Sequence, residues 1–337
     1  MNRKIQTIFL IILLNTICSY AQNKSGTASG QFLQIPVGGK AIAMGGAFTA
    51  LSDDPTALFW NPGAISRTIK NKMYVSQTNW LVGSKHQFLA AQLRFTDQDV
   101  IGVCFNLLDY GEREEITTVD QPDGTGEFWE ASDLAVSIAY ARNLTDRFSI
   151  GGSVKYISQK ILHVNATTLA VDLGLLFKTQ FNGLQIGASM RNFGGELQMQ
   201  GRDLITQVDL DKEASGNNET IVSYLKTDKW PIPLTFTVGV AMPIISNKLI
   251  AMTLAGDVVR PTDNSQVLNC GADILVMKMI SLRAGYQALF RETKQQGLTA
   301  GMGLKLPIQY ADIIFDYTYQ EYGFFGNIST LSLTIGF

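Results

Sequence analysis

Leu331-Ser332-Leu333-Thr334-Ile335-Gly336-Phe337 is the stretch that decides the fold, because its apolar residues alternate strictly with small or polar ones. Successive side chains of a β-strand point to opposite faces, so one face of this segment is entirely apolar and the other is not. The aromatic side chain of Phe337 belongs to the apolar face. The pattern predicts a strand with one side against an apolar phase.

This strand resembles the C-terminal assembly signal of bacterial outer-membrane β-barrels, and Leu333, Ile335 and Phe337 are the residues that carry the resemblance. It implies a protein of the cell outer membrane, with outer-membrane lipid around it. The rest of the sequence can be tested against that expectation.

The beginning of the chain has the three parts of a signal peptide. Met1-Asn2-Arg3-Lys4 is basic, Ile8 to Leu14 is apolar, and Ser19-Tyr20-Ala21 provides small residues for cleavage. We expect residues 1–21 to be a signal peptide that is cleaved after Ala21. Cys18 raises the alternative of a lipoprotein, but Asn15 and Ile17 fit that motif poorly.

The composition favours a barrel over a helical membrane protein. Apolar residues make up 46% of the chain and charged residues 17%, yet the apolar residues are dispersed. Beyond the signal there is no run of the roughly 18 apolar residues that a spanning helix needs. A closed barrel can cross lipid with weak, alternating segments. The net charge of −2 gives no support for nucleic-acid binding.

From about residue 72 onward the chain divides into strand-length segments with period-two patterning. The strongest outward row is Leu169, Val171, Leu173, Leu175 and Phe177, with Thr168, Ala170, Asp172 and Gly174 between them. We count about fourteen strands, an even number as expected for bacterial single-chain barrels. The last strand should close the ring against the strand that begins near Lys72. The fold class is therefore all-β, a transmembrane antiparallel β-barrel over residues 71–337.

Short turns and long loops alternate along the predicted strands. The long loops lie near residues 110–130, 193–229, 260–266, 288–296 and 320–327. In such barrels the short turns are periplasmic and the long loops lie outside, so both chain ends should be periplasmic. The loop from 112 to 130 is strongly acidic. Aromatic residues near the outer edge suggest an interfacial girdle: Trp80, Trp129, Trp230, Tyr322, Phe324 and Phe325.

The segment before the first strand does not alternate. Small residues dominate between residues 30 and 68, so this part of the chain can pack tightly. Asp54-Pro55 and Asn61-Pro62 each combine an N-cap residue with proline at the first helical position. We expect residues 22–70 to form a hatch of two short helical turns inside the barrel mouth.

Four motifs in this segment resemble the N-terminal hatch of the PorV/PorQ family. They are the runs Phe32-Leu33-Gln34-Ile35-Pro36-Val37-Gly38, Met44-Gly45-Gly46-Ala47-Phe48, Asp53-Asp54, and Ala57-Leu58-Phe59-Trp60-Asn61-Pro62. Members of that family are outer-membrane barrels associated with type IX secretion and share a fold with the FadL fatty-acid transporters. Gly63 stands where an alanine is usual in FadL-like hatches, a mild departure.

The resemblance implies a plugged barrel of 14 strands and leaves two non-enzymatic roles. In the first, the protein is a component of type IX secretion that binds the C-terminal domains of secreted cargo and carries the cargo to the attachment machinery. In the alternative, a FadL-like barrel transports hydrophobic small molecules past the hatch or sideways. Fold kinship does not choose between these roles.

Charged residues on the inward face are expected to hold the hatch or to line a water path, and we favour the first reading. Asp53 and Asp54 are expected to cap helices and to anchor the hatch to wall arginines. The set is Arg94, Lys155, Asp172, Arg191, Asp257, Asp273, Arg283, Lys305, Asp312 and Asp316.

No motif indicates an enzyme, a metal site or a cofactor. His86 and His163 are the two histidines, and spacing gives neither a nucleophile nor a carboxylate partner. The alternation places Cys104 in the lumen and Cys270 on the lipid face, so a disulfide between them is not expected. Two isolated thiols provide too few ligands for a metal.

Overall fold

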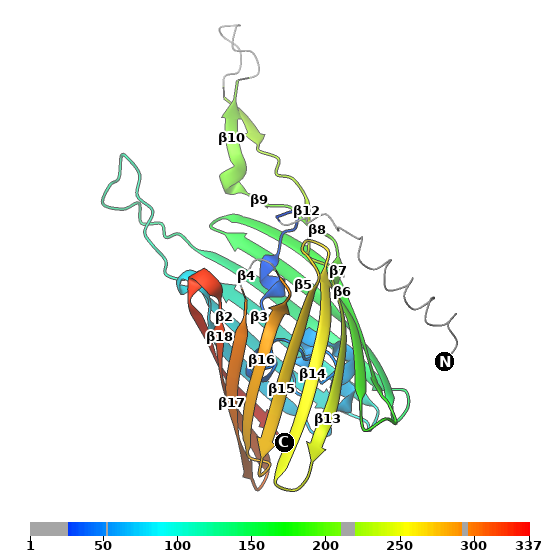
Figure 1. Ribbon diagram of the computed structural model, residues 1–337. Helices are drawn as coiled ribbons and strands as arrows, with labels where there is room; N and C mark the ends of the chain where they lie inside the picture. The colour runs from blue at the N-terminus through cyan, green and yellow to red at the C-terminus, as the bar shows by residue number, and fades with distance from the viewer. Residues whose placement is uncertain (1–25, 52, 210–219, 292–295) are drawn as a thin grey trace, which may run out of the picture.

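The computed structural model describes residues 26–51, 53–209, 220–291 and 296–337, and within them the chain forms a closed antiparallel β-barrel (Figure 1). The main sheet contains the two-residue strand β9 (Gln200–Gly201) and fourteen wall strands. The wall strands are β1 (Lys72–Asn79), β2 (Lys85–Arg94), β3 (Asp99–Asp109), β4 (Ala131–Asn143), β5 (Phe148–Ile161), β6 (Val164–Lys178), β7 (Gln185–Gly194), β13 (Thr235–Ser246), β14 (Ile250–Pro261), β15 (Val267–Val276), β16 (Ile280–Leu289), β17 (Leu298–Ile308), β18 (Ala311–Glu321) and β19 (Asn327–Gly336).

The ring closes between its first and last strands. Lys72 lies opposite Gly336 and Asn79 lies opposite Ser329, so β1 and β19 pair over the whole length of β1. Every other wall strand pairs with its neighbours along the chain, and β7 pairs with β13 across the long insertion. The predicted fold class, the count of fourteen strands and the closing pair are therefore confirmed.

The period-two pattern of the sequence matches the two faces of the wall. In β6, Leu169 and Leu173 are exposed on the outer face, while Ala170 and Asp172 between them are buried. The same alternation continues in β19, where Leu331 is exposed and Thr330 is buried. One irregularity interrupts it: the β6–β7 register shifts between Val171 and Leu173.

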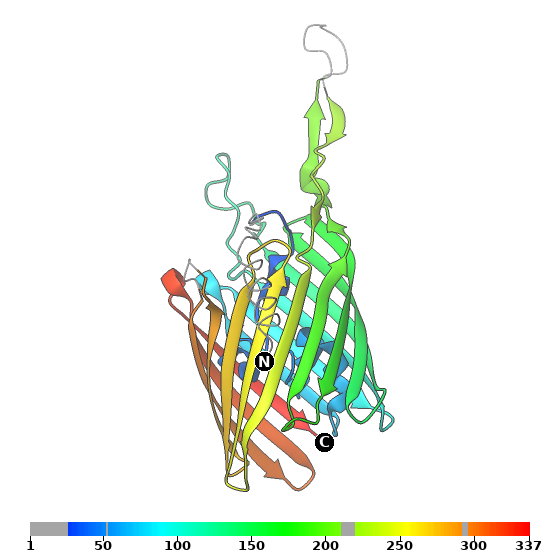
Figure 2. The same cartoon turned by 45° about the vertical axis from the view of Figure 1, so that its right-hand side comes forward.

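The two ends of the barrel differ in their connections. Short turns join the strands at the lower end in Figures 1 and 2, where Phe337 donates its backbone N–H to Asn71. The upper end carries the long loops and the short helices η3 (Leu81–Gly83) and η5 (Gly323–Phe325). We call these the short-turn end and the long-loop end.

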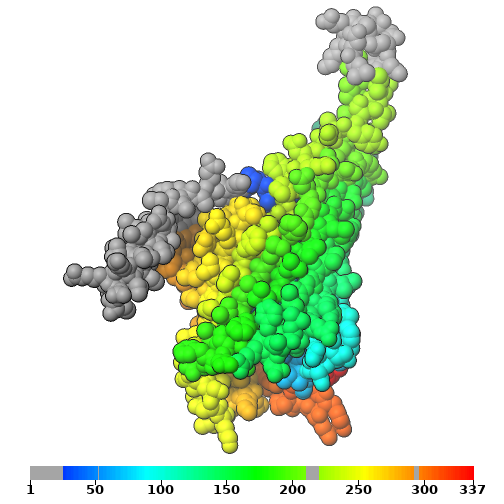
Figure 3. Space-filling model, turned by 90° about the vertical axis from the view of Figure 1, so that its right-hand side faces the viewer, coloured from blue at the N-terminus to red at the C-terminus, as the bar shows by residue number. Residues whose placement is uncertain are grey.

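The insertion between β7 and β13 is more ordered than the loop that the sequence predicted. It contains β8 (Glu196–Leu197), η4 (Arg202–Leu204), β10 (Ile205–Val208), β11 (Ile221–Tyr224) and β12 (Trp230–Pro231). β10 and β11 pair only with each other and project well beyond the rim (Figures 1 and 3). These strands have four residues each, too few for a clear periodic signal.

The chain before β1 lies in the lumen, and we call residues 26–70 the lumen segment. It contains η1 (Gln31–Gln34), α2 (Gly39–Ala43), α3 (Ala57–Trp60) and η2 (Pro62–Arg67), which is four helical turns where the sequence predicted two. Glycines at Gly30 and Gly38 precede the two extra turns in place of capping side chains, so the capping pattern missed them.

The lumen segment runs through the barrel from end to end. At the long-loop end Ser29 donates its backbone N–H to Pro231, and at the short-turn end Arg67 donates to the carbonyls of Thr145 and Asp146. The first described residues therefore lie at the long-loop end. The predicted signal peptide and its cleavage after Ala21 fall outside the described residues. No helix among the described residues is long and apolar enough to cross a membrane.

Candidate functional site

The lumen segment fits the wall through glycines. A side chain at Gly271 or Gly285 would collide with the backbone at Met44 and Gly45, and one at Gly174 would collide with Asn61 and Gly63. Wall strands β15, β16 and β6 thus let two backbones touch, which only glycine permits. The alternating pattern of β6 predicted that Gly174 lies on the inward face, but it could not predict what Gly174 contacts.

Several polar residues hold the segment against the wall, among them Asp257 and Asn61. The Asp257 carboxylate on β14 accepts the backbone N–H groups of Phe48 (3.0 Å) and Thr49 (2.9 Å). The Asn61 amide donates to the carbonyls of Thr49 (2.8 Å) and Leu175 (2.9 Å), and its oxygen accepts the N–H of Gly63. Asn61 thereby caps η2, and also ties two parts of the segment to β6.

The acidic pair of the hatch motif makes its side-chain contacts within the lumen segment. Asp53 forms an ion pair with Lys40 of the same segment (2.7 Å), and Asp54 accepts the N–H of Thr56 (2.8 Å) ahead of α3. Neither bonds to a wall arginine among the described residues, so that expectation is wrong. Arg283 of the wall instead forms ion pairs with Asp273 (3.0 Å) and Asp316 (2.5 Å), which are also wall residues.

The other residues of the predicted motif lie along the segment. Phe32 and Leu33 on η1 are buried in an apolar cluster at the long-loop end. Gly38, Gly45 and Gly46 have positive φ angles of 92°, 66° and 75°, which glycine adopts readily. Met44 follows α2 and is fully buried, and Pro62 is the first residue of η2. At the other end of the chain, the apolar residues Leu333, Ile335 and Phe337 alternate with the buried residues of β19.

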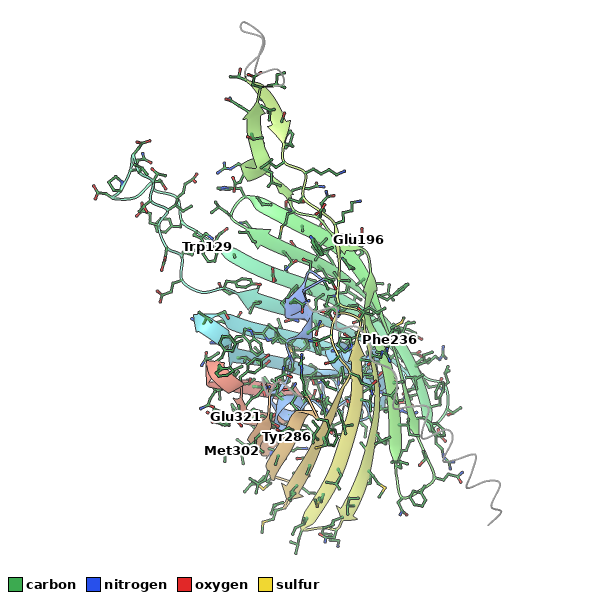
Figure 4. The ribbon with its side chains drawn as sticks, turned by 45° about the horizontal axis from the view of Figure 1, so that its top comes forward. Trp129, Glu196, Phe236, Tyr286, Met302 and Glu321 are labelled. Atoms are coloured by element: carbon green, nitrogen blue, oxygen red, sulfur yellow. The ribbon has the colours of Figure 1, made fainter. Side chains whose placement is uncertain are left out.

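Beside η1, at the long-loop end, a cavity of about 620 Å³ opens. Phe59 and Trp60 of α3 line it, together with aromatic residues of the rim: Trp80, Tyr110, Trp129 and Tyr322. The rings of Trp80 and Tyr322 meet edge to face at 5.3 Å. Figure 4 shows Trp129 on the loop beside the mouth. Three of the aromatics assigned to a membrane girdle therefore line the cavity, which we call the mouth cavity.

A buried cation also lines the mouth cavity. Arg191 on β7 is 7% exposed, and its guanidinium lies over the rings of Phe59 (4.7 Å) and Trp60 (5.4 Å). Its Nε and Nη1 atoms have no hydrogen-bond partner in the part of the chain that the structure describes. The sequence placed Arg191 among the inward charges, but nothing in the pattern distinguished it from the paired ones.

A second pocket of about 620 Å³ lies where β7 and β13 stop pairing. It is lined by Asn192, Phe193 and Leu234 of the wall and by the chain at Thr27. Asn192 has a positive φ of 60° and breaks the regular strand beside the β6–β7 register shift. We call this pocket the wall gap. The side chains of Gln31 and Gln34 fix η1 near it through Asp263.

The histidines and cysteines do not form a reactive centre. His86 is buried against Asn106. His163 bonds to Arg202 and to the carboxylate of Asp203 (3.2 Å), a partner that the sequence spacing did not reveal. Cys104 is buried and Cys270 partly exposed, and both are free thiols. Within the described ranges, no three His, Cys, Asp or Glu residues are grouped to hold a metal.

Comparison with known proteins gives the fold. No protein-family model matches the chain, and no curated protein sequence matches it. Among solved structures it is similar to the CymD monoaromatic hydrocarbon channel (TM-score 0.57, 12% identity, covering 90% of this chain and 97% of that one).

Two toluene transporters are similar to it as well. They are TodX of Pseudomonas putida (TM-score 0.54, 13% identity) and TbuX of Ralstonia pickettii (TM-score 0.53, 14% identity), and each match covers 89% of this chain and 97% of the transporter. At these identities the likeness extends to the fold. The chain has a closed, fourteen-stranded FadL-like barrel fold.

Proposed function

We propose that the protein is an outer-membrane barrel that takes up hydrophobic small molecules through the mouth cavity. The observation that carries this proposal is the lining of the cavity, in which aromatic side chains from α3, the β1–β2 turn and the β3–β4 and β18–β19 loops converge. Small-molecule sites are usually concave and combine apolar or aromatic side chains with polar groups that orient the ligand. The mouth cavity has both, because polar side chains such as Asn269 and Gln287 line it beside the aromatic ones. The fold shared with hydrocarbon and toluene channels supports the same function.

In this proposal the long loops face the outside and the short turns, with Phe337, face the periplasm. Residues 1–21 are a signal peptide removed after Ala21, residues 22–70 act as the hatch, and residues 71–337 form the barrel. The contacts of Asp257 and Asn61 support the hatch role, because they fix the lumen segment to the wall below the mouth cavity. A bound molecule leaves either past the hatch or sideways through the wall gap.

The test is to fill the mouth cavity. Val267 lines it, while Leu268 beside it belongs to the opposite face of β15. We expect Val267→Trp to weaken the binding of the fluorescent apolar probe 1-N-phenylnaphthylamine by about tenfold, a change of about 1.4 kcal/mol. Leu268→Trp is the matched control and should bind the probe as the parent does. Equal binding by both variants would place the ligand elsewhere and contradict the proposal.

A second candidate is the secretion role, in which the barrel binds type IX components and the C-terminal domains of cargo. The observation that favours it is the β10–β11 hairpin, which carries the exposed apolar side chains Ile205, Val222 and Tyr224 outside the rim. A pull-down from detergent-solubilised membranes tests it. We expect the parent to recover secretion components or sorting-domain proteins, and the hairpin deletion to lose them. If the parent recovers neither class of protein, this role is excluded.

A further inference from the structure

The charges that line the mouth cavity all have one sign. Among the lining residues that the structure describes, the ionised side chains are Arg191 and Arg291, and no carboxylate is present. Arg291 lies at the rim and donates to the side chain of Asn264 (2.9 Å). Arg191 lies deep and is nine-tenths buried. The deep end of the cavity therefore carries the positive charge of Arg191.

Arg191 is not satisfied by its own surroundings. Asp172 is bound to Lys155 (2.9 Å), and Asp257 accepts the N–H groups of Phe48 and Thr49 through its Oδ2 atom, while its Oδ1 atom has no hydrogen-bond partner among the described residues. The Nε and Nη1 donors of Arg191 consequently lack an acceptor among the described residues. Buried donors are almost always paired, so an acceptor that comes from outside the chain is the expected partner.

The shape of that acceptor follows from the geometry of a guanidinium. Its planar fork of N–H groups matches a carboxylate through two parallel hydrogen bonds. The faces of Phe59 and Trp60 hold the fork in place by cation–π contact. The side chain is thus pre-positioned before any ligand enters.

The rest of the cavity favours a ring over an alkyl chain. Beyond Arg191 the lining includes Trp80, Tyr110, Trp129 and Tyr322, and Trp80 and Tyr322 already form an edge-to-face pair. Flat rings gain from offset or edge-to-face contacts with such side chains, in addition to the area they bury. A straight alkyl chain gains only the burial.

From these observations we infer that the mouth cavity binds an aromatic carboxylic acid in its anionic form. The carboxylate lies on Arg191 and the ring lies among the aromatic residues of the rim. This inference rests on the proposed function and adds to it the chemical class of the molecule. It also separates this chain from channels whose described cargo is an uncharged hydrocarbon.

The experiment compares three probes on the full-length protein in detergent at pH 7, by isothermal titration calorimetry. They are 2-naphthoate, its uncharged methyl ester, and decanoate, which keeps the carboxylate but has no ring. We expect 2-naphthoate to bind about tenfold or more tightly than either of the others. Binding of the ester or of decanoate as tight as that of 2-naphthoate overturns the inference and leaves the proposed function intact.

Variants locate the carboxylate. Arg191→Gln should abolish the preference for 2-naphthoate over its ester, while Arg260→Gln, an exposed arginine of β14, should keep it. The ligand comparison on the parent protein stands without these variants, so a folding defect of Arg191→Gln does not decide the outcome. A preference that survives in a folded Arg191→Gln variant overturns the assignment. Failure of all three probes and of 1-N-phenylnaphthylamine contradicts the proposed function itself.

Discussion

Asn61 shows how much one side chain contributes to the closed lumen. It is fully buried, and its amide pairs with three backbone groups, two within the lumen segment and one on β6. The sequence predicted its capping role from the following Pro62, because that pattern is local. The bond to Leu175 joins residues 114 positions apart, and local patterns cannot predict it.

We expect Asn61→Ala to loosen the lumen segment and to raise conductance in planar bilayers. The substitution leaves two carbonyls and one N–H without their partner, at about 1–3 kcal/mol for each buried group. Asp53→Ala is the comparison, since its ion pair with Lys40 is largely exposed on the Asp53 side and contributes about 0–1 kcal/mol. Parent-like conductance in both variants would show that Asn61 does not hold the segment.

At the scale of elements, the wall and the insertion differ in what sequence can reveal. A wall strand of ten or more residues shows five outward side chains, and lipid on that face keeps the alternation regular, as in β6. The two short strands of the β10–β11 hairpin pair with each other outside the barrel, where no apolar phase enforces a pattern. The sequence therefore predicted the strands of the wall and missed the hairpin.

The hairpin should be dispensable for the barrel. Replacing residues 205–224 with a short Gly/Ser linker removes a two-stranded sheet that forms no ladder with the wall. We expect the variant to keep the parent's heat-dependent shift in gel mobility and its binding of 1-N-phenylnaphthylamine. Loss of the folded band would mean that the hairpin supports the rim.

At the scale of the whole molecule, the site depends on a fit that no single segment encodes. The mouth cavity exists because the lumen segment fills the barrel below it and leaves the space beside η1 open. Sequence predicted the barrel, the inward charges and the plug as separate parts. It could not place Trp80, Tyr110 and Tyr322 in one cavity with Arg191, because their meeting depends on closure of the ring.

Gly271 tests that fit. We expect Gly271→Ala to destabilise the protein and to raise the susceptibility of the lumen segment to limited proteolysis, because the new methyl group would overlap the carbonyl of Met44. Gly256→Ala on the neighbouring strand is the matched control. A methyl group there meets its nearest atom, the carbonyl of Asn269, at 3.7 Å, an ordinary contact. Equal resistance of the two variants would contradict a tight backbone fit.

The backbone contacts at Gly174, Gly271 and Gly285 also bear on the order of assembly. They lie on β6, β15 and β16, several strands apart around the wall, so a finished ring leaves the segment little clearance to slide into place. The segment leads directly into β1, and β1 is the strand that β19 joins to complete the circle. We therefore expect the barrel to close around the lumen segment, so that the pairing of β1 with β19 encloses the first part of the chain.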